Sequence, residues 1–386
     1  MFYKINLKFL FVFPLIITLA RLIGFPFNTN YLLFLILILL NVFNFNIRRF
    51  LFLLMITFII SIQVLFMGES LDYISLVYFL NFIMILFFTY NIGLKKLKLY
   101  TIENLNCIKA TIIIISIINI IMFISKNGWS LVWGKMQFQS IYGFPHDACY
   151  LFITIQTYCI IAYLYSEKYK YIFKILTYMF FIFSCFTNAR TPFLISIFLI
   201  GLFSYKTIKN KKVNVIFIIF MLLLIVLINV NYNFIKYENL PIISKFIRGE
   251  EIGNMTSSRD FIWQSIMDSG YKNFSFWRKI FGEGFGISFR INQMFFGEPL
   301  WSHNDIYEIL VSFGLVGLII YAYNFFKAFL LTDSKISIIV VCLVLFFNGI
   351  YTYYMFVCAI PIFILSISEL SKKKGTSDEK NNVYDS

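Results

Sequence analysis

Two histidines are the side chains whose ordinary pKa lies closest to neutral pH, and both stand in polar stretches of the chain. His303 precedes Asn304, with Glu308 about one helical turn further on, and His146 precedes Asp147. A histidine in such a place can take a proton from a substrate hydroxyl, or it can be a hydrogen-bonded structural residue. Nothing resembles H-E-x-x-H, which argues against metal-assisted hydrolysis, so we expect no metal site.

Two arginines are candidate anion-binding residues. Arg190 lies in a short turn, 188–192, between two apolar runs, and Arg259 follows Ser258 at the predicted start of a helix. A helix N-terminus beside a guanidinium can bind a phosphate group. The alternatives are that Arg259 pairs with Asp260 on a solvated surface and that Arg190 reaches lipid phosphate.

The elements that must carry these residues are membrane-spanning helices. Of the 386 residues, 60% are hydrophobic and only 13% are charged, and the mean hydropathy is +0.80. Because about 20 apolar residues cross a bilayer, the sequence predicts an all-α polytopic membrane protein with about twelve helices. We expect these helices over residues 9–27, 31–45, 50–67, 71–90, 107–124, 148–166, 171–187, 192–208, 213–234, 306–330, 336–350 and 353–370.

The net charge of +14 indicates membrane topology and not a nucleic-acid partner. Lysine and arginine clusters such as 48–49, 209–212 and 372–374 follow alternate predicted helices, and such clusters mark cytoplasmic loops. Both termini are therefore predicted to be cytoplasmic. The predicted organisation is nine helices over 1–234, a large extracytoplasmic loop over 235–305, three helices over 306–370 and a cytoplasmic tail over 371–386.

The large loop carries as many basic as acidic residues and is electrically neutral. Anion binding there must come from individually placed arginines and not from bulk charge. A capped helix is predicted from Ser257 to Met267, with its apolar stripe on the membrane face of the loop. The glycines Gly282, Gly284 and Gly286 lack the setting of a dinucleotide fingerprint and predict a tight turn that can form a backbone anion nest.

The order of these motifs resembles the O-antigen ligase and polymerase superfamily. The motifs are N-A-R-T at 188–191, S-R-D-F-I-W at 258–263, G-E-G-F-G at 282–286, S-H-N-D at 302–305 and F-G-L-V-G-L at 313–318. The resemblance covers Thr187 to Tyr321. The segment from Ser140 to Asp147 is also similar to an earlier loop of that family, although Asp147 stands where asparagine is more usual, which leaves the role of His146 open.

The resemblance implies a membrane-embedded glycosyltransferase with a GT-C-like fold in the bacterial inner membrane. It implies that Arg190 and Arg259 bind the diphosphate of an undecaprenyl-diphosphate-linked oligosaccharide, that His303 is the catalytic base, and that Asn304 or Glu308 orients it. No cofactor is implied. The expected partners are the lipid-linked substrates, the lipid bilayer and a chain-length regulator.

Within this superfamily, we expect a repeat-unit polymerase for O-antigen of lipopolysaccharide, capsule or exopolysaccharide. An O-antigen ligase, which uses the same donor with a lipid A core acceptor, is the alternative. A lipid-linked oligosaccharide flippase or transporter is less favoured, because such proteins commonly hold charged residues near the bilayer midplane. The middles of the predicted spans hold asparagine and glutamine and essentially no charged residue.

Overall fold

The computed structural model describes a set of residues that is mostly helical. The chain divides into two compact units, which are taken in turn below. The predicted spans at 31–45, 71–90, 213–234 and 353–370, and the start of the large loop, lie outside the described residues. The described residues are 15–16, 18–24, 51, 55, 105–132, 135–165, 169–207, 259–284, 286–300, 302–330 and 335–349.

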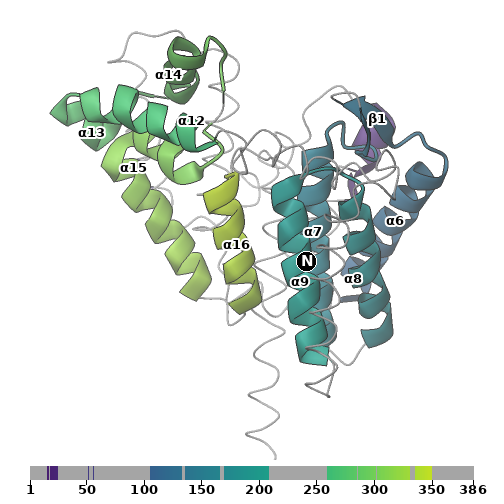
Figure 1. Cartoon of the computed structure of the whole chain (residues 1–386). Helices are drawn as coiled ribbons and strands as arrows, with labels where there is room; N and C mark the ends of the chain where they lie inside the picture. Colours follow the sequence, from purple (N-terminus) through teal and green to yellow (C-terminus); the bar gives the residue numbers. More distant parts are fainter. Residues whose placement is uncertain are drawn as a thin grey trace, which may run out of the picture. The chain divides into compact units, whose positions relative to one another are not determined.

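The first unit is built on four helices that match predicted spans at 107–124, 148–166, 171–187 and 192–208 (Figure 1). They are α6 (Leu105–Ile124), α7 (Pro145–Tyr165), α8 (Lys170–Cys185) and α9 (Arg190–Thr207). Helix α7 packs against both α8 and α9, and its side chains are buried along almost its whole length. Apolar residues occur all round α7, as expected for a helix enclosed by others.

A two-stranded antiparallel hairpin departs from the predicted all-α fold. Strand β1 (Trp129–Val132) pairs with β2 (Lys135–Phe138) between α6 and α7. Its anchor is Phe138, which is fully buried and whose backbone N–H donates to the carbonyl of Phe186 at 2.8 Å. The Trp129 and Phe138 rings lie 5.7 Å apart. The apolar ends of the two strands therefore pack against the C-terminal end of α8. A prediction based on long apolar segments does not find such short strands.

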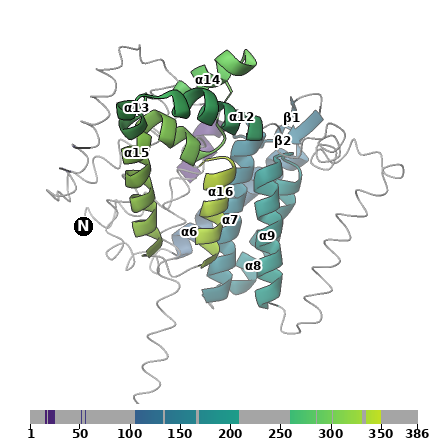
Figure 2. The ribbon, with the colours of Figure 1, turned by 60° about the vertical axis from the view of Figure 1, so that its left-hand side comes forward.

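Within 259–349, the described part of the second unit forms five α-helices, seen from a second direction in Figure 2. They are α12 (Arg259–Ser265), α13 (Phe276–Phe281), α14 (Ile287–Phe296), α15 (Asp305–Leu330) and α16 (Lys335–Phe347). Helices α15 and α16 coincide with the predicted spans at 306–330 and 336–350. Among the described residues, the segments long and apolar enough to cross a membrane are Asn106–Ile124, Pro145–Leu164 and Asp305–Tyr323.

The apolar stripe of α12 packs inside this unit, which corrects the prediction that it lies on the membrane. Ile262 and Ile266 form a buried cluster with Ile287 and Ile291 of α14 and Val311 of α15. Ile262 and Ile266 of this stripe are thus part of the hydrophobic core of the second unit. The spacing of the stripe alone could not distinguish a protein partner from a lipid partner.

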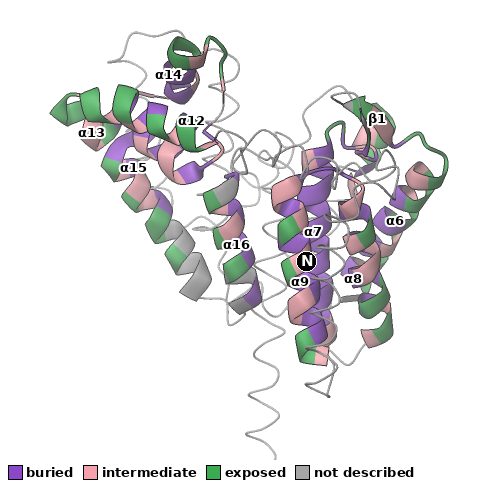
Figure 3. Cartoon of the chain, viewed as in Figure 1, coloured by how far each residue is buried: buried purple, intermediate pink, exposed green. Residues whose placement is uncertain are grey.

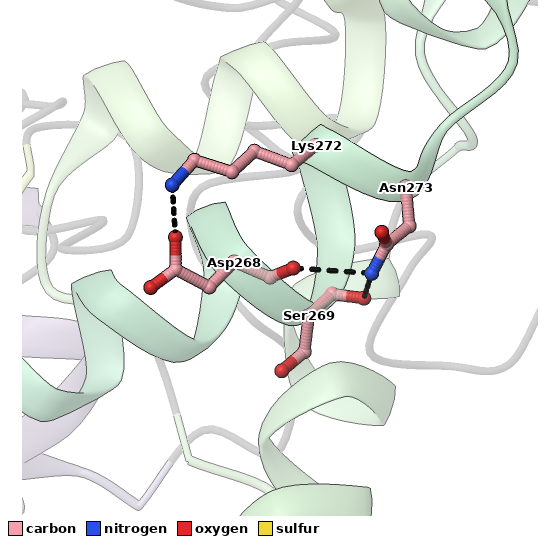
Figure 4. A network of polar contacts seen from close by, with 4 residues as sticks. All are labelled: Asp268, Ser269, Lys272 and Asn273. Carbon is pink, nitrogen blue, oxygen red and sulfur yellow. Dashed lines mark hydrogen bonds and ion pairs between the residues drawn. The ribbon is translucent and has the colours of Figure 1, made fainter.

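The end of α12 widens into a π-helical turn, Ile266–Gly270, followed by a 3-10 turn, Tyr271–Asn273. The side-chain amide of Asn273 donates to the backbone carbonyls of Asp268 at 3.1 Å and Ser269 at 3.3 Å, and Lys272 forms an ion pair with Asp268 (Figure 4). These contacts satisfy helix-terminal carbonyls that would otherwise lack partners. The turn also brings Gly270 against α14, where an added Cβ would lie 2.4 Å from Ile291 Cδ1.

Helix α15 is broken at Gly314, whose φ of 65° and ψ of −164° are open only to glycine. The carbonyls of Val311 and Ser312 accept hydrogen bonds from the backbone N–H groups of Glu283 and Gly284, each at 2.9 Å. The turn predicted at Gly282, Gly284 and Gly286 is present, and all three have φ between 81° and 89°. This turn therefore supplies the donors that an unbroken helix would have supplied itself.

The two arms of α15 fold toward each other across this bend. The Tyr321 hydroxyl donates to Asp305 Oδ2 at 2.5 Å, although sixteen residues separate them. In a straight helix that separation corresponds to about 24 Å, so the bond requires the bend at Gly314. The predicted span at 306–330 is helical as expected, but it is two arms and not one rod.

We expect Gly314→Ala to destabilise the protein more than an alanine substitution at a positive-φ glycine that has open space around it. An alanine Cβ at this position would lie 2.3 Å from the Ile280 carbonyl oxygen, in addition to a backbone cost of roughly 1–3 kcal/mol for a conformation that is essentially restricted to glycine. The matched control is Gly297→Ala, which has a φ of 78° but no atom within 4 Å of the added Cβ. Thermal unfolding in detergent measures both, and an equal loss in the two variants would contradict the steric argument.

Candidate active site

Four of the predicted site residues, Arg259, His303, Asn304 and Glu308, lie in the second unit. Arg259 is the first residue of α12, and the other three lie at the start of α15. Arg190 belongs to the first unit. The structure therefore brings the predicted base into one unit with one of the two predicted arginines.

The backbone of His303 is left-handed, with a φ of 52°. This conformation is uncommon for residues other than glycine, although histidine, asparagine and aspartate adopt it more often than the others. Ser302, immediately before it, is fully buried and donates its hydroxyl to the Asn304 carbonyl at 3.2 Å. The chain thus turns sharply at His303 directly before α15 begins.

The His303 imidazole is held neutral by its surroundings. Burial lowers its pKa from 6.5 to about 3, with the positive charge of Arg259 acting in the same direction and a side-chain hydrogen bond to Asn348 opposing both. Because the Arg259 charge acts on the ring, the two predicted functional groups are electrostatic neighbours. Asn348 was not identified from the sequence, because it lies at the end of α16, 45 residues from His303.

Trp263 fixes the segment that carries His303. Its indole Nε1–H donates to the Ser302 carbonyl at 2.7 Å. Its ring stacks on Tyr307 of α15 at 5.7 Å and meets Phe346 of α16 edge-on at 5.9 Å. Since Trp263 lies four residues after Arg259, both project from the same face of α12.

The sequence placed Trp263 only in an apolar stripe. A partly buried indole usually finds a partner for its N–H group, and that requirement was the available signal. The identity of the partner could not be read from the sequence, because Ser302 lies 39 residues away.

Asn304 caps α15. Its Oδ1 accepts hydrogen bonds from the backbone N–H groups of Ile306 at 2.9 Å and Tyr307 at 3.4 Å. A capping side chain of this kind satisfies helix N–H groups that lack an intrahelical partner. Asn304 therefore fixes the start of the helix at Asp305, two residues after His303.

Glu308 is buried among serines. The Ser312 hydroxyl donates to its Oε1 at 3.4 Å, and the hydroxyl groups of Ser288 of α14 and Ser302 lie near the carboxyl group. A buried carboxyl group needs such polar surroundings. Glu308 is therefore hydrogen bonded within the first arm of α15 and lies beside α14 and the His303 turn.

Asp305 is a further buried acidic residue that the sequence analysis did not select. It is fully buried and accepts the Tyr321 hydrogen bond described above. The motif S-H-N-D therefore combines a left-handed histidine, a helix cap and an acidic residue that closes the bend. Each of the last three residues has a different structural role.

Arg190 and His146 lie in the first unit, at the first residue of α9 and in the first turn of α7. Helices α7, α8 and α9 follow one another through short connections and pack together, so α7 and α9 run in the same direction. Their N-termini, with His146 and Arg190, therefore lie at the same end of the unit. The His146 ring stacks on Phe144 at 5.6 Å.

No group of three or more histidine, cysteine, aspartate or glutamate residues that could hold a metal ion occurs among the described residues. The side chains that act on or adjoin the His303 imidazole include the guanidinium of Arg259, the amide of Asn348 and the hydroxyl of Ser302. This set suits hydrogen bonding and anion binding.

Comparison with known families finds a match over a segment that carries the motifs of the site. Residues 175–322 match a family model described as O-antigen ligase, which confirms the resemblance to the O-antigen ligase and polymerase superfamily over this segment. The segment is less than half of the chain and includes Arg190, Arg259 and the first residues of α15. No curated protein and no solved structure matches the chain. The family covers O-antigen ligases and related polymerases, which are membrane glycosyltransferase-like enzymes.

We expect Trp263→Phe to lower activity about tenfold, because it leaves the buried Ser302 carbonyl without its donor at a cost of roughly 1–3 kcal/mol and loosens the His303 turn. The control is Trp129→Phe, which removes a comparable indole bond to the Phe123 carbonyl in the other unit, 3.1 Å long. Both variants are compared as glycan product per amount of folded protein. Equal effects of the two would show that Trp263 has only a general stabilising role.

His303 should stay neutral between pH 8 and pH 5, because its pKa is lowered to about 3. Carbon-13 labelling of histidine and NMR in detergent would test this directly, since the chain has only two histidines. A His146→Gln variant assigns the signals. In Arg259→Ala the pKa of His303 should rise, because a repelling positive charge is removed, whereas Arg278→Ala should leave it unchanged. A His303 signal that titrates near 6.5 in the unmodified protein would contradict this account.

Proposed function

We propose that this protein is a polymerase of undecaprenyl-diphosphate-linked oligosaccharide repeat units in the bacterial inner membrane. It transfers the growing donor glycan to a sugar hydroxyl of an acceptor repeat unit for O-antigen, capsule or exopolysaccharide. The observation that carries the proposal is the proximity of Arg259 to His303, which places a cation for a diphosphate beside a base for a hydroxyl. The match over residues 175–322 supports the same class of chemistry.

The reaction exchanges one bond at the anomeric carbon of the donor sugar. The acceptor hydroxyl oxygen bonds to that carbon, and the bond from the carbon to the diphosphate oxygen breaks with its electron pair. The hydroxyl proton moves to a ring nitrogen of His303. Negative charge collects on the leaving diphosphate, where Arg259 stabilises it, so that neither a cofactor nor a metal is part of the proposal.

Donor binding also prepares His303 for its role. A base with a pKa of about 3 takes a proton poorly near neutral pH. Of the two causes that lower this pKa, burial is the larger and the Arg259 charge the smaller. The diphosphate brings negative charge to Arg259 and so offsets the second cause, the positive charge that disfavours protonation of the ring. His303 therefore becomes a stronger base when the donor is bound, which couples proton transfer to the presence of the substrate.

Asn304 and Glu308 act in this proposal through the frame and not by direct contact with His303. Asn304 caps α15, and Glu308 hydrogen bonds to Ser312 within the first arm of α15. The residue that orients the ring is Asn348, which hydrogen bonds to it. This assignment replaces the expectation that Asn304 or Glu308 orients the base.

An O-antigen ligase is the second candidate, since it uses the same donor and chemistry with a lipid A core acceptor. The polymerase assignment, the undecaprenyl donor, the chain-length regulator, the two cytoplasmic termini and the inner-membrane location are all parts of the proposal. A flippase is less favoured, because the described charged groups gather at the loop and the ends of helices and not along the middle of the spans.

Deleting the gene and sizing the surface glycan would test this function. A polymerase predicts that single repeat units remain, a ligase predicts long chains held on the lipid carrier, and a flippase predicts precursor facing the cytoplasm. Restoring the strain with Arg259→Lys should give little long glycan, because a lysine cannot reproduce the planar two-pronged contact of a guanidinium with phosphate.

The control for Arg259→Lys is Arg278→Lys, which keeps a positive charge beside Glu283 and should restore long glycan. A strain with His303→Gln should lose activity by about 10²–10⁴-fold if this residue is the base. Normal glycan from Arg259→Lys or His303→Gln, at normal protein level, would exclude the role given to that residue.

A further inference from the structure

Helix α13 carries an aromatic surface that the proposed function does not use. Phe276 and Trp277 are 69% and 67% exposed, and Phe281 is 39% exposed. Their rings contact in sequence, at 5.5 Å for Phe276 with Trp277 and 6.1 Å for Trp277 with Phe281. Figure 3 shows α13 as mostly exposed in its unit. These three residues form one apolar surface, called here the α13 aromatic face.

Basic side chains lie on the same short helix. Arg278 and Lys279 follow Trp277 directly, and Arg278 forms a 2.9 Å ion pair with Glu283 of the glycine turn. Tryptophan and phenylalanine beside lysine and arginine are typical of segments that lie at a membrane surface, where rings contact the acyl chains and cations contact phosphate. A protein partner would not require this combination.

The α13 aromatic face adjoins the apolar arm of α15. The α13 helix ends at the bend, where the Ile280 carbonyl oxygen lies so close to Gly314 that an added Cβ would be 2.3 Å from it. The second arm starts at this point and exposes apolar side chains at intervals of four, four and three residues, which places them on one side of a helix. These side chains are Leu315, Ile319, Tyr323 and Phe326.

We propose that α13 lies along the interface of the lipid bilayer at the level of the α15 bend. In this arrangement, the α13 aromatic face enters the boundary between headgroups and acyl chains. The second arm of α15 continues into the hydrocarbon with its exposed apolar side chains against lipid. The occupant of the α13 aromatic face is therefore the bilayer itself. This inference does not depend on the reaction that the protein catalyses.

This contact sets the height of the His303 turn relative to the membrane. Helix α13 is joined to the bend through Gly282, where an added Cβ would lie 2.3 Å from the Ser312 carbonyl oxygen. The first arm of α15 leads from this bend back to Asp305 and the His303 turn. With α13 fixed at the interface, the His303 turn is held within one short helical arm of the lipid headgroups.

Spin-label accessibility in phospholipid nanodiscs would test the proposal. In a full-length, cysteine-free background, single labels are placed by Trp277→Cys and Phe281→Cys. The matched controls are Ile319→Cys on the second arm of α15 and Glu298→Cys at an exposed polar position after α14. Power saturation compares collisions with oxygen, which concentrates in lipid, and with a water-soluble nickel chelate.

The proposal predicts that labels at 277 and 281 collide preferentially with oxygen. Their ratio of oxygen collisions to nickel-chelate collisions should be several-fold above the ratio at 298 and should approach the ratio at 319. Frequent collisions with the nickel chelate at 277 and 281 would mean that α13 lies in water and would overturn the proposal. Rare collisions with both reagents would mean that a protein surface covers the α13 aromatic face and would also overturn it.

A second measurement covers the case in which a cysteine variant does not fold. Brominated lipids quench tryptophan fluorescence at short range. The unmodified protein should therefore show a quenched component of its fluorescence that is absent from the Trp277→Phe variant. This substitution keeps an aromatic ring on α13. Quenching that is identical with and without Trp277 would contradict its location in the interface.

Discussion

The second unit depends on an exchange of backbone hydrogen bonds at the break in α15. A break in an apolar helix leaves carbonyl groups without donors, and in a bilayer such groups cost several kcal/mol each. The glycine turn meets this requirement, because the N–H groups of Glu283 and Gly284 donate to the carbonyls of Val311 and Ser312. Only glycine at 282 and 314 lets the two backbones approach so closely. The loop and the apolar helix are therefore one folding unit.

The candidate site is assembled on this frame by contacts that are far apart in the sequence. The start of α12 supplies Arg259, and Trp263 on the same helix holds the turn before α15. The end of α16 supplies Asn348. Because three separate helices meet at His303, its environment is decided by packing and not by its neighbours in the chain. The same packing lowers the pKa of His303 and keeps its ring neutral.

The sequence predicted the positions of the long apolar helices well, because hydrophobicity and length determine where a helix can cross a membrane, whereas the short helices α13 and α14 were not predicted. The predicted range 107–124 corresponds to α6, and 192–208 corresponds to α9. The break at Gly314 was not predicted, since glycine is common in membrane helices and its φ depends on a distant turn. The β1–β2 hairpin was also missed, because its strands are only four residues long.

The family match covers the motifs on which the site prediction rests, and the structure adds contacts that the sequence did not give. The segment matched by the family model contains the predicted Arg259 and His303, and the structure places them near each other. Asn304 and Glu308 were expected to orient His303, but their observed contacts are with helix N–H groups and serines. A sequence gives the spacing of polar residues, whereas the partner of each depends on how α12, α14 and α15 pack.

The left-handed backbone of His303 means that two separate demands act on a single position. One concerns the imidazole, and the other concerns the φ of 52°, which most side chains disfavour. Alanine at 303 would therefore lose the ring and strain the turn together, whereas asparagine tolerates this backbone and changes mainly the chemistry. The backbone conformation at position 303 therefore limits which residue types fit there, independently of any catalytic requirement. A natural variant with asparagine there would keep the architecture of the site without its imidazole.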